Sequence, residues 1–217
     1  MARRSLLLAL IASLALALPA VVEARRGTYL VKRPTARSTR ALGNKRIKAS
    51  RQGIVWAQKR IAKHMKPTPL IHSPELSKRY GVEVYLKVEA ATEVGSFKIR
   101  GALNTVLSLP GKRRQRGVVA ASTGNHAQGV ALAAKKNGIK ATIVMPEGAS
   151  QLKAKKTRKL GAEVLLQGSD YGKSVQIAKN LAKRDGRTFI PGYAHKRVIE
   201  GQGTIGREIL RQLPQAD

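Results

Sequence analysis

The sequence predicts an α/β protein in which helices cover both faces of a parallel sheet. Three observations support this prediction. Segments typical of strands and of helices alternate from Pro67 onward, the later strands are short apolar runs, and glycines mark the turns between elements. The chain has 217 residues, of which 42% are hydrophobic, and this is enough for one domain or a domain and a half.

The first expected strand covers residues 82–88, in which apolar and polar side chains alternate. A helix is expected over residues 98–109, because Pro110 and Gly111 would stop it there. The same kind of signal predicts the remaining elements, which are, in order, a strand at 117–121, a helix at 126–137, a strand at 141–145, a helix at 151–160, a strand at 162–166, a helix at 172–184 and a strand at 188–190.

The N-terminus has the pattern of a targeting segment. Arg3 and Arg4 precede an apolar run over residues 6–22, which predicts a signal-peptide-like segment at 1–24. A buried helix or a retained membrane anchor is the alternative. Such a signal followed by a basic segment is typical of a secreted protein. It is also typical of a plastid protein that enters through the secretory route with two successive targeting signals. If this N-terminus is an unrelated upstream extension, we expect a cytoplasmic protein.

Residues 25–66 are basic, and no acidic residue lies between Glu23 and Glu75. A stretch with charges of one sign is usually solvated, so we expect a disordered leader or linker here. The net charge of the chain is +30, which leaves open a basic protein that binds polyanions. However, the aromatic residues of this stretch are Tyr29 and Trp56, and it has no recognition motif. We therefore expect no nucleic-acid partner.

The chain has no cysteine. Disulfide scaffolds, thiolate metal sites and a catalytic cysteine are thereby excluded, and the sequence predicts no metal site. Any chemistry must come from other side chains and from the backbone.

Three separated motifs carry the functional signal. Residues 96–102 read Ser-Phe-Lys-Ile-Arg-Gly-Ala, residues 122–129 read Ser-Thr-Gly-Asn-His-Ala-Gln-Gly, and residues 198–204 read Val-Ile-Glu-Gly-Gln-Gly-Thr. Together they resemble the signatures of the serine/threonine dehydratase (threonine ammonia-lyase-like) group within the fold-type II pyridoxal-phosphate enzymes. The resemblance runs from about Pro67 to Asp217, which is nearly everything after the basic segment.

The resemblance implies a tryptophan synthase β-like fold with three αβα layers, and pyridoxal 5'-phosphate as the cofactor. It also implies a smaller α/β domain at 98–190 and an incomplete larger domain made of 67–97 and 191–217. Similar enzymes continue into a glycine-rich loop that binds the cofactor phosphate. We therefore expect the C-terminal half of the larger domain to be missing from this chain.

Lys98 is the residue expected to hold the cofactor. A lysine that forms an imine must be available as a neutral amine, and both burial and the positive end of a helix disfavour its ammonium form. Lys98 stands at the start of a predicted helix, just after Ser96 as the expected N-cap. The resemblance further implies that Phe97 packs beside the cofactor ring and that Ser96 helps to fix the turn.

The second motif is a turn from a strand to a helix, where free backbone amides can bind a carboxylate. In similar enzymes this loop holds the substrate carboxylate, which corresponds here to Ser122, Thr123, Gly124, Asn125 and His126. The resemblance implies that Asn125 also bonds the phenolic oxygen of the cofactor. We expect His126 to shape the loop rather than to act as a base.

The third motif contains a G-x-G-x-x-G pattern from Gly201 to Gly206, which is typical of dinucleotide-binding turns. No second strand and no acidic residue follow it at the spacing that ribose binding needs. We expect it to be the start of a helix in the larger domain.

The reaction implied by the resemblance is β-elimination from L-threonine or L-serine, giving a 2-oxo acid and ammonia. The small-molecule partner is then an amino acid, and a homo-oligomer is left open for the full-length enzyme. An amino-acid racemase of the same family is the alternative. Similar racemases carry serine where this chain has Thr123 and dehydratases commonly carry alanine, so this position leaves both reactions open, with elimination favoured.

Overall fold

The computed structural model describes residues 24–25, 28–29 and 47–216. Residues from 49 onward form one compact unit, and the described residues between 12 and 48 belong to a second. In the second unit, strands β1 (Ala24–Arg25) and β2 (Thr28–Tyr29) pair antiparallel. Residues 1–23 of the predicted signal-peptide-like segment lie outside the described residues. No helix in the described part is long and apolar enough to cross a membrane.

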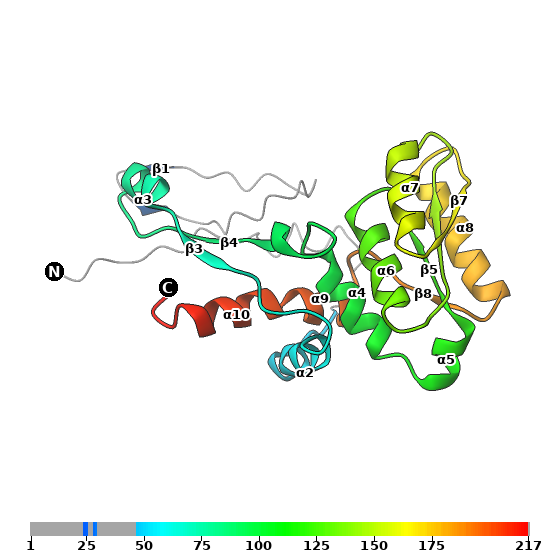
Figure 1. The fold of residues 1–217 in the computed structure, drawn as a ribbon, viewed down its shortest axis with the longest axis horizontal. Helices are drawn as coiled ribbons and strands as arrows, with labels where there is room; N and C mark the ends of the chain where they lie inside the picture. Colours follow the sequence, from blue (N-terminus) through cyan, green and yellow to red (C-terminus); the bar gives the residue numbers. More distant parts are fainter. Residues whose placement is uncertain (1–23, 26–27, 30–46, 217) are drawn as a thin grey trace. The chain divides into compact units, whose positions relative to one another are not determined.

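The unit from residue 49 onward is α/β, as predicted (Figure 1). Its strands are β3 (Leu70–His72), β4 (Tyr85–Lys87), β5 (Val118–Ala121), β6 (Ala141–Met145), β7 (Glu163–Leu166) and β8 (Thr188–Phe189). Its helices are α2 (Arg51–Ile61), α3 (Pro74–Tyr80), the 3-10 turn η1 (Glu89–Ala91), α4 (Lys98–Leu107), α5 (Gly111–Arg116), α6 (Asn125–Lys135), α7 (Gln151–Lys159), α8 (Tyr171–Arg184), α9 (Lys196–Gln202) and α10 (Thr204–Gln212).

Four strands form a parallel sheet in the order β7-β6-β5-β8. Each of these strands and the helices α4, α6, α7 and α8 lie where the sequence predicts them, within two residues at either end. The two central strands, β5 and β6, are buried along their whole length, because successive side chains alternate between the apolar layers on the two faces of the sheet. The prediction of a parallel sheet covered on both faces is therefore confirmed.

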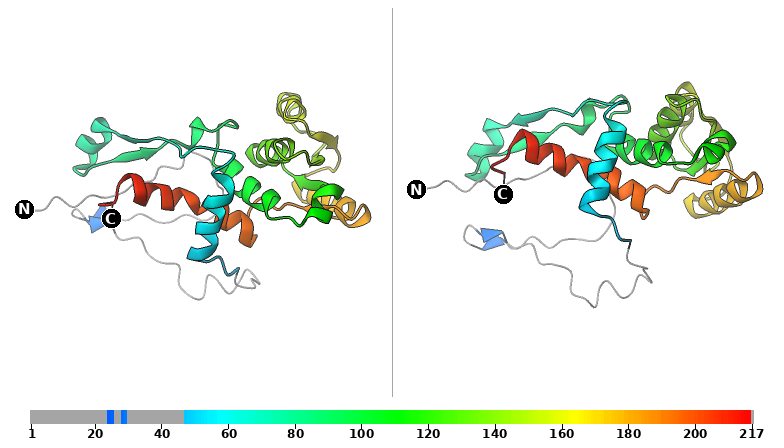
Figure 2. Two further views of the ribbon diagram at one scale, coloured as in Figure 1. Left: turned by 60° about the horizontal axis from the view of Figure 1, so that its bottom comes forward. Right: turned by 90° about the horizontal axis from the view of Figure 1, so that it is seen from below.

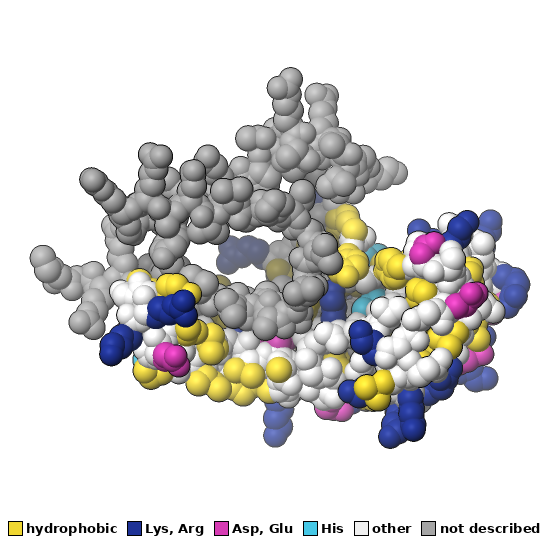
Figure 3. Space-filling view, turned by 90° about the horizontal axis from the view of Figure 1, so that it is seen from above, with side chains coloured by type: hydrophobic (Ala, Val, Ile, Leu, Met, Phe, Trp, Pro, Cys, Tyr) yellow, Lys and Arg dark blue, Asp and Glu magenta, His cyan; other side chains and the backbone are white. Residues whose placement is uncertain are grey.

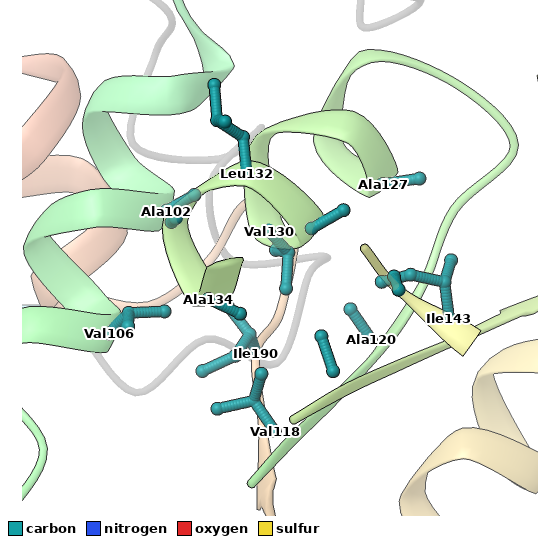
Figure 4. Packing of buried hydrophobic residues seen from close by; sticks show 14 of the residues in the cluster. Ala102, Val106, Val118, Ala120, Ala127, Val130, Leu132, Ala134, Ile143 and Ile190 are labelled. Carbon is teal, nitrogen blue, oxygen red and sulfur yellow. The ribbon is translucent and has the colours of Figure 1, made fainter. Parts of the chain in front are cut away.

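The two layers can be followed residue by residue along β5. Val118 and Ala120 face α6 and belong to the larger core cluster, where Figure 4 shows them near Val130 and Ala134. Val119 and Ala121 face the opposite way and pack in a second cluster with apolar side chains of α8. The arrangement is thus helix, sheet, helix, as expected for three αβα layers.

Strand β4 is shorter than the predicted strand at 82–88, because the residues before it bond to a helix instead. The backbone N–H of Val84 donates to the Ser77 hydroxyl of α3 at 2.9 Å, and the Val84 carbonyl accepts from the Ser73 N–H at 2.8 Å. From Tyr85 onward the strand pairs antiparallel with β3, which the sequence did not predict.

Helix α2 contradicts part of the expected disordered linker at 25–66. The Ser50 hydroxyl caps it by accepting from the Gly53 N–H at 2.9 Å. Gly53, Ala57 and Ile61 recur every four residues and are buried, so one face of this basic helix packs against α4, α9 and α10. Figure 2 shows α2 lying across α9 and α10. The expectation of disorder is wrong for residues 51–61.

The G-x-G-x-x-G segment forms the end of α9 and the start of α10, so the expected start of a helix is confirmed. Its first glycine allows α9 to approach α4 closely. A Cβ atom at Gly201 would lie 2.6 Å from the Gly101 Cα atom and 2.7 Å from the Arg100 carbonyl oxygen. No side chain fits between the two backbones. The pattern therefore serves helix packing.

A buried group of four charges connects α4 to other segments. The fully buried Arg100 guanidinium donates to both oxygens of Glu89 on η1, at 2.7 and 2.8 Å, and to both oxygens of Glu208 on α10, at 2.6 and 2.8 Å. Lys87 of β4 lies 2.7 Å from Glu208. Two positive and two negative charges thus cancel in the interior. Paired in this way, they fix α4 relative to η1 and α10.

Candidate active site

The candidate site lies where the strand order of the parallel sheet reverses. From β5 the chain proceeds to β6 and β7 on one side, whereas β8 joins the other side of β5. The segments after β5 and β8 therefore leave neighbouring parallel strands at the same edge of the sheet. In open α/β sheets, ligands bind at such a switch point, outside the carboxyl ends of the strands.

Lys98 is the first residue of α4, and its amine meets the segment that follows β8. The Nζ atom donates to the Gly192 carbonyl at 3.3 Å, lies 4.2 Å from the centre of the Tyr193 ring and 5.0 Å from that of Phe97. Burial lowers the pKa of Lys98 below its ordinary value. Its neutral amine is therefore more available than that of a solvated lysine.

The turn before α4 differs from the expected one, because Ser96 is not the N-cap. Phe97 precedes the helix, and no side chain caps it. The Thr92 hydroxyl instead closes the turn, accepting from the Ser96 N–H and donating to the Ser96 carbonyl, both at 2.9 Å. The Ser96 hydroxyl is buried and has no partner among the described residues. This buried hydroxyl two residues before Lys98 is thus free to bond a ligand or water.

Helix α6 approaches Lys98 closely from the other side. A Cβ atom at Gly129 would lie 3.2 Å from both the carbonyl carbon and the carbonyl oxygen of Lys98. This distance is tighter than ordinary van der Waals contact, so a larger residue at this position would require the Lys98 backbone to shift by a few tenths of an ångström. The backbone of Lys98 is fixed by this contact and by the neighbouring Gly101–Gly201 contact.

The residues of the second motif lie in the turn from β5 to α6, as predicted. The Ser122 hydroxyl accepts from the Gly124 N–H at 3.2 Å, and Asn125 begins the helix. The first-turn amides of a helix have no acceptor within it, and the helix dipole favours a negative charge at this end. The turn of Ser122, Thr123 and Gly124 can therefore receive a carboxylate, although its role in substrate binding remains a prediction.

His126 is the buried member of this motif. Its Nε2 atom lies 3.1 Å from the Ile190 carbonyl oxygen. Burial, assisted by the charge of Lys98, lowers the pKa of His126 to about 4 despite this hydrogen bond. The imidazole is therefore neutral at physiological pH, which agrees with a loop-shaping role and not with a base that must titrate near pH 7.

Sequence reasoning missed Gly192 and Tyr193, although both contact the Lys98 amine. They follow β8, which pairs with β5. The rule that ligands gather at the carboxyl ends of parallel strands could have identified them, once the neighbour of β5 was known.

The described residues fit an aldehyde cofactor with a flat aromatic ring. Lys98 supplies an amine whose pKa burial has lowered, and Phe97 and Tyr193 supply aromatic faces beside it. The unpartnered Ser96 hydroxyl adds a buried polar group. These are the groups that pyridoxal phosphate would need on the side of its aldehyde.

Comparisons with known proteins agree with this geometry. The family model described as "Pyridoxal-phosphate dependent enzyme" matches residues 61–217. The chain is 51% identical over 146 residues to a chloroplastic biosynthetic threonine dehydratase 1 of Solanum lycopersicum, covering 67% of this chain and 24% of that protein. It is 47% identical over 166 residues to an L-threonine ammonia-lyase of Thermotoga maritima, covering 76% and 41%.

Solved structures give the same result. The processed form of threonine deaminase isoform 2 from Solanum lycopersicum aligns with a TM-score of 0.69 and 39% identity, covering 78% of this chain and 51% of that one. Maize serine racemase aligns with a TM-score of 0.74 and 35% identity, covering 76% and 50%. The chain thus spans between a quarter and a half of the length of these curated relatives and structures.

Proposed function

The chain belongs to the family of pyridoxal-phosphate-dependent enzymes, and from this premise we propose that it serves the deamination of L-threonine or L-serine by β-elimination. The α-proton and the β-hydroxyl leave as water, and hydrolysis of the resulting unsaturated amine then gives a 2-oxo acid and ammonia. The single observation that supports the proposal most is the position of Lys98. It begins a helix, its amine is partly desolvated, and it lies at the switch point of a parallel sheet. The similarity to threonine dehydratases supports threonine as the first substrate to test.

Each residue has a defined task in the proposed reaction. Lys98 holds the cofactor through Nζ and, once displaced by the substrate amine, accepts the α-proton at the same atom. The turn amides and Asn125 orient the substrate carboxylate. Pyridoxal phosphate, when bound, supplies the electron sink. Tyr193 and Phe97 cover the Lys98 amine, which limits the access of water.

Reductive trapping tests the assignment of Lys98. The protein is incubated with pyridoxal phosphate, reduced with borohydride, digested and analysed by mass spectrometry for the modified lysine. We expect the modification to concentrate on Lys98, and the Lys98→Ala variant to lose that site without a new dominant one. Trapping that is spread evenly over exposed lysines, or a dominant site elsewhere, contradicts the proposal. Oxo-acid release from threonine and serine then identifies the substrate.

Racemisation is the second candidate, and it is supported by the similarity to maize serine racemase at 35% identity. A racemase needs a second proton donor on the face of the substrate opposite Lys98. Chiral analysis after incubation with L-serine separates the two reactions, because elimination yields pyruvate whereas racemisation yields D-serine.

The leader and the assembly of the protein are part of the same proposal. We propose that the apolar run over residues 6–22 directs export or plastid entry and is then removed. N-terminal sequencing of protein from its native source tests this, since an intact Met1 on soluble protein would contradict it. Light scattering, which measures the mass of the protein in solution, tests whether it forms a homo-oligomer.

A further inference from the structure

The segment Ile190–Tyr193 makes two of the contacts to the Lys98 amine, a carbonyl from Gly192 and a ring from Tyr193, and the Phe97 ring makes a third. It begins at the sheet, where the Ile190 N–H donates to the Val119 carbonyl at 2.8 Å. Beyond that bond, the strand pairing ends. The contacts that hold this segment over Lys98 must therefore come from another element.

That element is α6, through the side chain of His126. Its Nε2 atom lies 3.1 Å from the Ile190 carbonyl oxygen, and because a carbonyl oxygen only accepts, Nε2 must carry the proton. The ring also packs under Gly192, where an added Cβ atom would lie 3.4 Å from ring carbon Cδ2. His126 is only 6% exposed, so both contacts are screened from water. One side chain thus holds the segment at two points.

We propose that His126 is a positioning residue, which holds Ile190–Tyr193 over Lys98 and so keeps the Lys98 amine partly desolvated. The inference rests on the proposed function, in which Lys98 must be available as an amine. It also connects the two walls of the site, because His126 directly follows Asn125 of the predicted substrate-binding turn. A neutral imidazole is required for the role, since a charged ring would be buried without a counter-charge.

The groups that face the Lys98 amine determine how its pKa should respond when the segment moves. His126 faces it from α6, Tyr193 faces it from the segment after β8, and Tyr171 of α8 adjoins Tyr193. Within the described part of the chain, burial is the cause that lowers the pKa of Lys98. If the segment moves away, water reaches the amine, and the pKa should rise toward the ordinary value of about 10.4.

Two variants of His126 separate the hydrogen bond from the packing. His126→Phe keeps a ring but removes the N–H donor, whereas His126→Gln restores a donor. Thr157→Val is the matched control, because Thr157 is also buried and its hydroxyl donates to the Lys153 carbonyl at 2.9 Å, in a helix that the site does not use. All three variants should fold with only a modest loss of stability, because each changes a single buried hydrogen bond.

The measurement is the pH midpoint at which Lys98 reacts with a trace of acetic anhydride, read by mass spectrometry against the exposed Lys173. If a substitution only gave the reagent better access to Lys98, the extent of acetylation would change but the pH midpoint would stay the same. We expect His126→Phe to raise the Lys98 midpoint, His126→Gln to return it toward the wild-type value, and Thr157→Val to leave it unchanged. An unchanged midpoint in His126→Phe, or an equal rise in Thr157→Val, overturns the inference.

The tautomer gives a second, independent outcome. A long-range ¹H–¹⁵N spectrum should show the Nε2–H form of one histidine from pH 5 to pH 8, and this signal should disappear in His126→Phe. An Nδ1–H form or a titration in that range overturns the inference. Trapping of pyridoxal phosphate away from Lys98 in the wild-type protein would instead contradict the proposed function, so the two failures are distinguishable.

Discussion

Gly201→Ala tests whether the G-x-G-x-x-G pattern serves helix packing. The added methyl group would lie 2.6 Å from the Gly101 Cα atom and 2.9 Å from its nitrogen. Ordinary contact requires about 3.4 Å or more, so α4 and α9 must separate by roughly 1 Å. Overpacking of this kind typically costs ~1–3 kcal/mol, and backbone neighbours that cannot rotate away place it near the upper end. Alanine recovers up to about 1 kcal/mol by its helix propensity.

Gly206→Ala is the matched control, because it is the last glycine of the same pattern and nothing lies within 4 Å of an added Cβ atom. It gains the helix propensity without the clash. The difference between the two variants should therefore be about 2–3 kcal/mol in the free energy of unfolding. Urea unfolding followed by circular dichroism measures it. If both variants unfold at the same urea concentration, the close-packing argument is refuted.

Three further predictions concern charges and caps. Arg100→Met should cost ~3–5 kcal/mol in thermal or urea unfolding, because Glu89 and Glu208 would remain buried without their partner; a loss below about 1 kcal/mol would contradict this. Burial opposes the ionisation of Glu208, but hydrogen bonds from Arg100 and Lys87 outweigh it and lower its pKa. The stability that ionised Glu208 contributes is thus fully present above its unfolded pKa of about 4.3, and it is lost as the pH falls through the lower folded pKa. Glu208→Gln should therefore make the free energy of unfolding depend less on pH in the acid range. Asp170→Ala removes the cap of α8 and should lower the urea midpoint of unfolding at neutral pH, with little effect on trapping at Lys98.

The parallel sheet could be predicted because its signals are local. Strand β6 is an apolar run that ends at Pro146, and α4 ends before Pro110. Strand β3 is only three residues long and has no period that distinguishes it from a loop. In α2 the uniform charge obscured a real signal, the small and apolar residues Gly53, Ala57 and Ile61 at four-residue spacing.

The candidate site was predictable as a list of residues but not as an arrangement. The motifs identified Lys98 and Asn125, which begin α4 and α6. The contact between His126 and Ile190 joins residues 64 positions apart, and no local pattern encodes such a pairing. Ser96 followed the usual preference for an N-cap, yet Thr92 closes that turn, because a hydroxyl four residues earlier reaches both backbone groups.

The buried four-charge group also constrains the order in which the chain can acquire its structure during synthesis. Glu89 precedes Arg100 by 11 residues and is available at once, whereas Glu208 follows it by 108 residues. At a synthesis rate of about 5–20 residues per second, the second carboxylate emerges roughly 5–20 s after the first pair can form. Until then Lys87 has no Glu208 carboxylate to pair with, and α4 is held through Arg100 by Glu89 alone. The nascent chain therefore carries Lys98 for seconds before both ion pairs of Arg100 hold the helix that Lys98 begins.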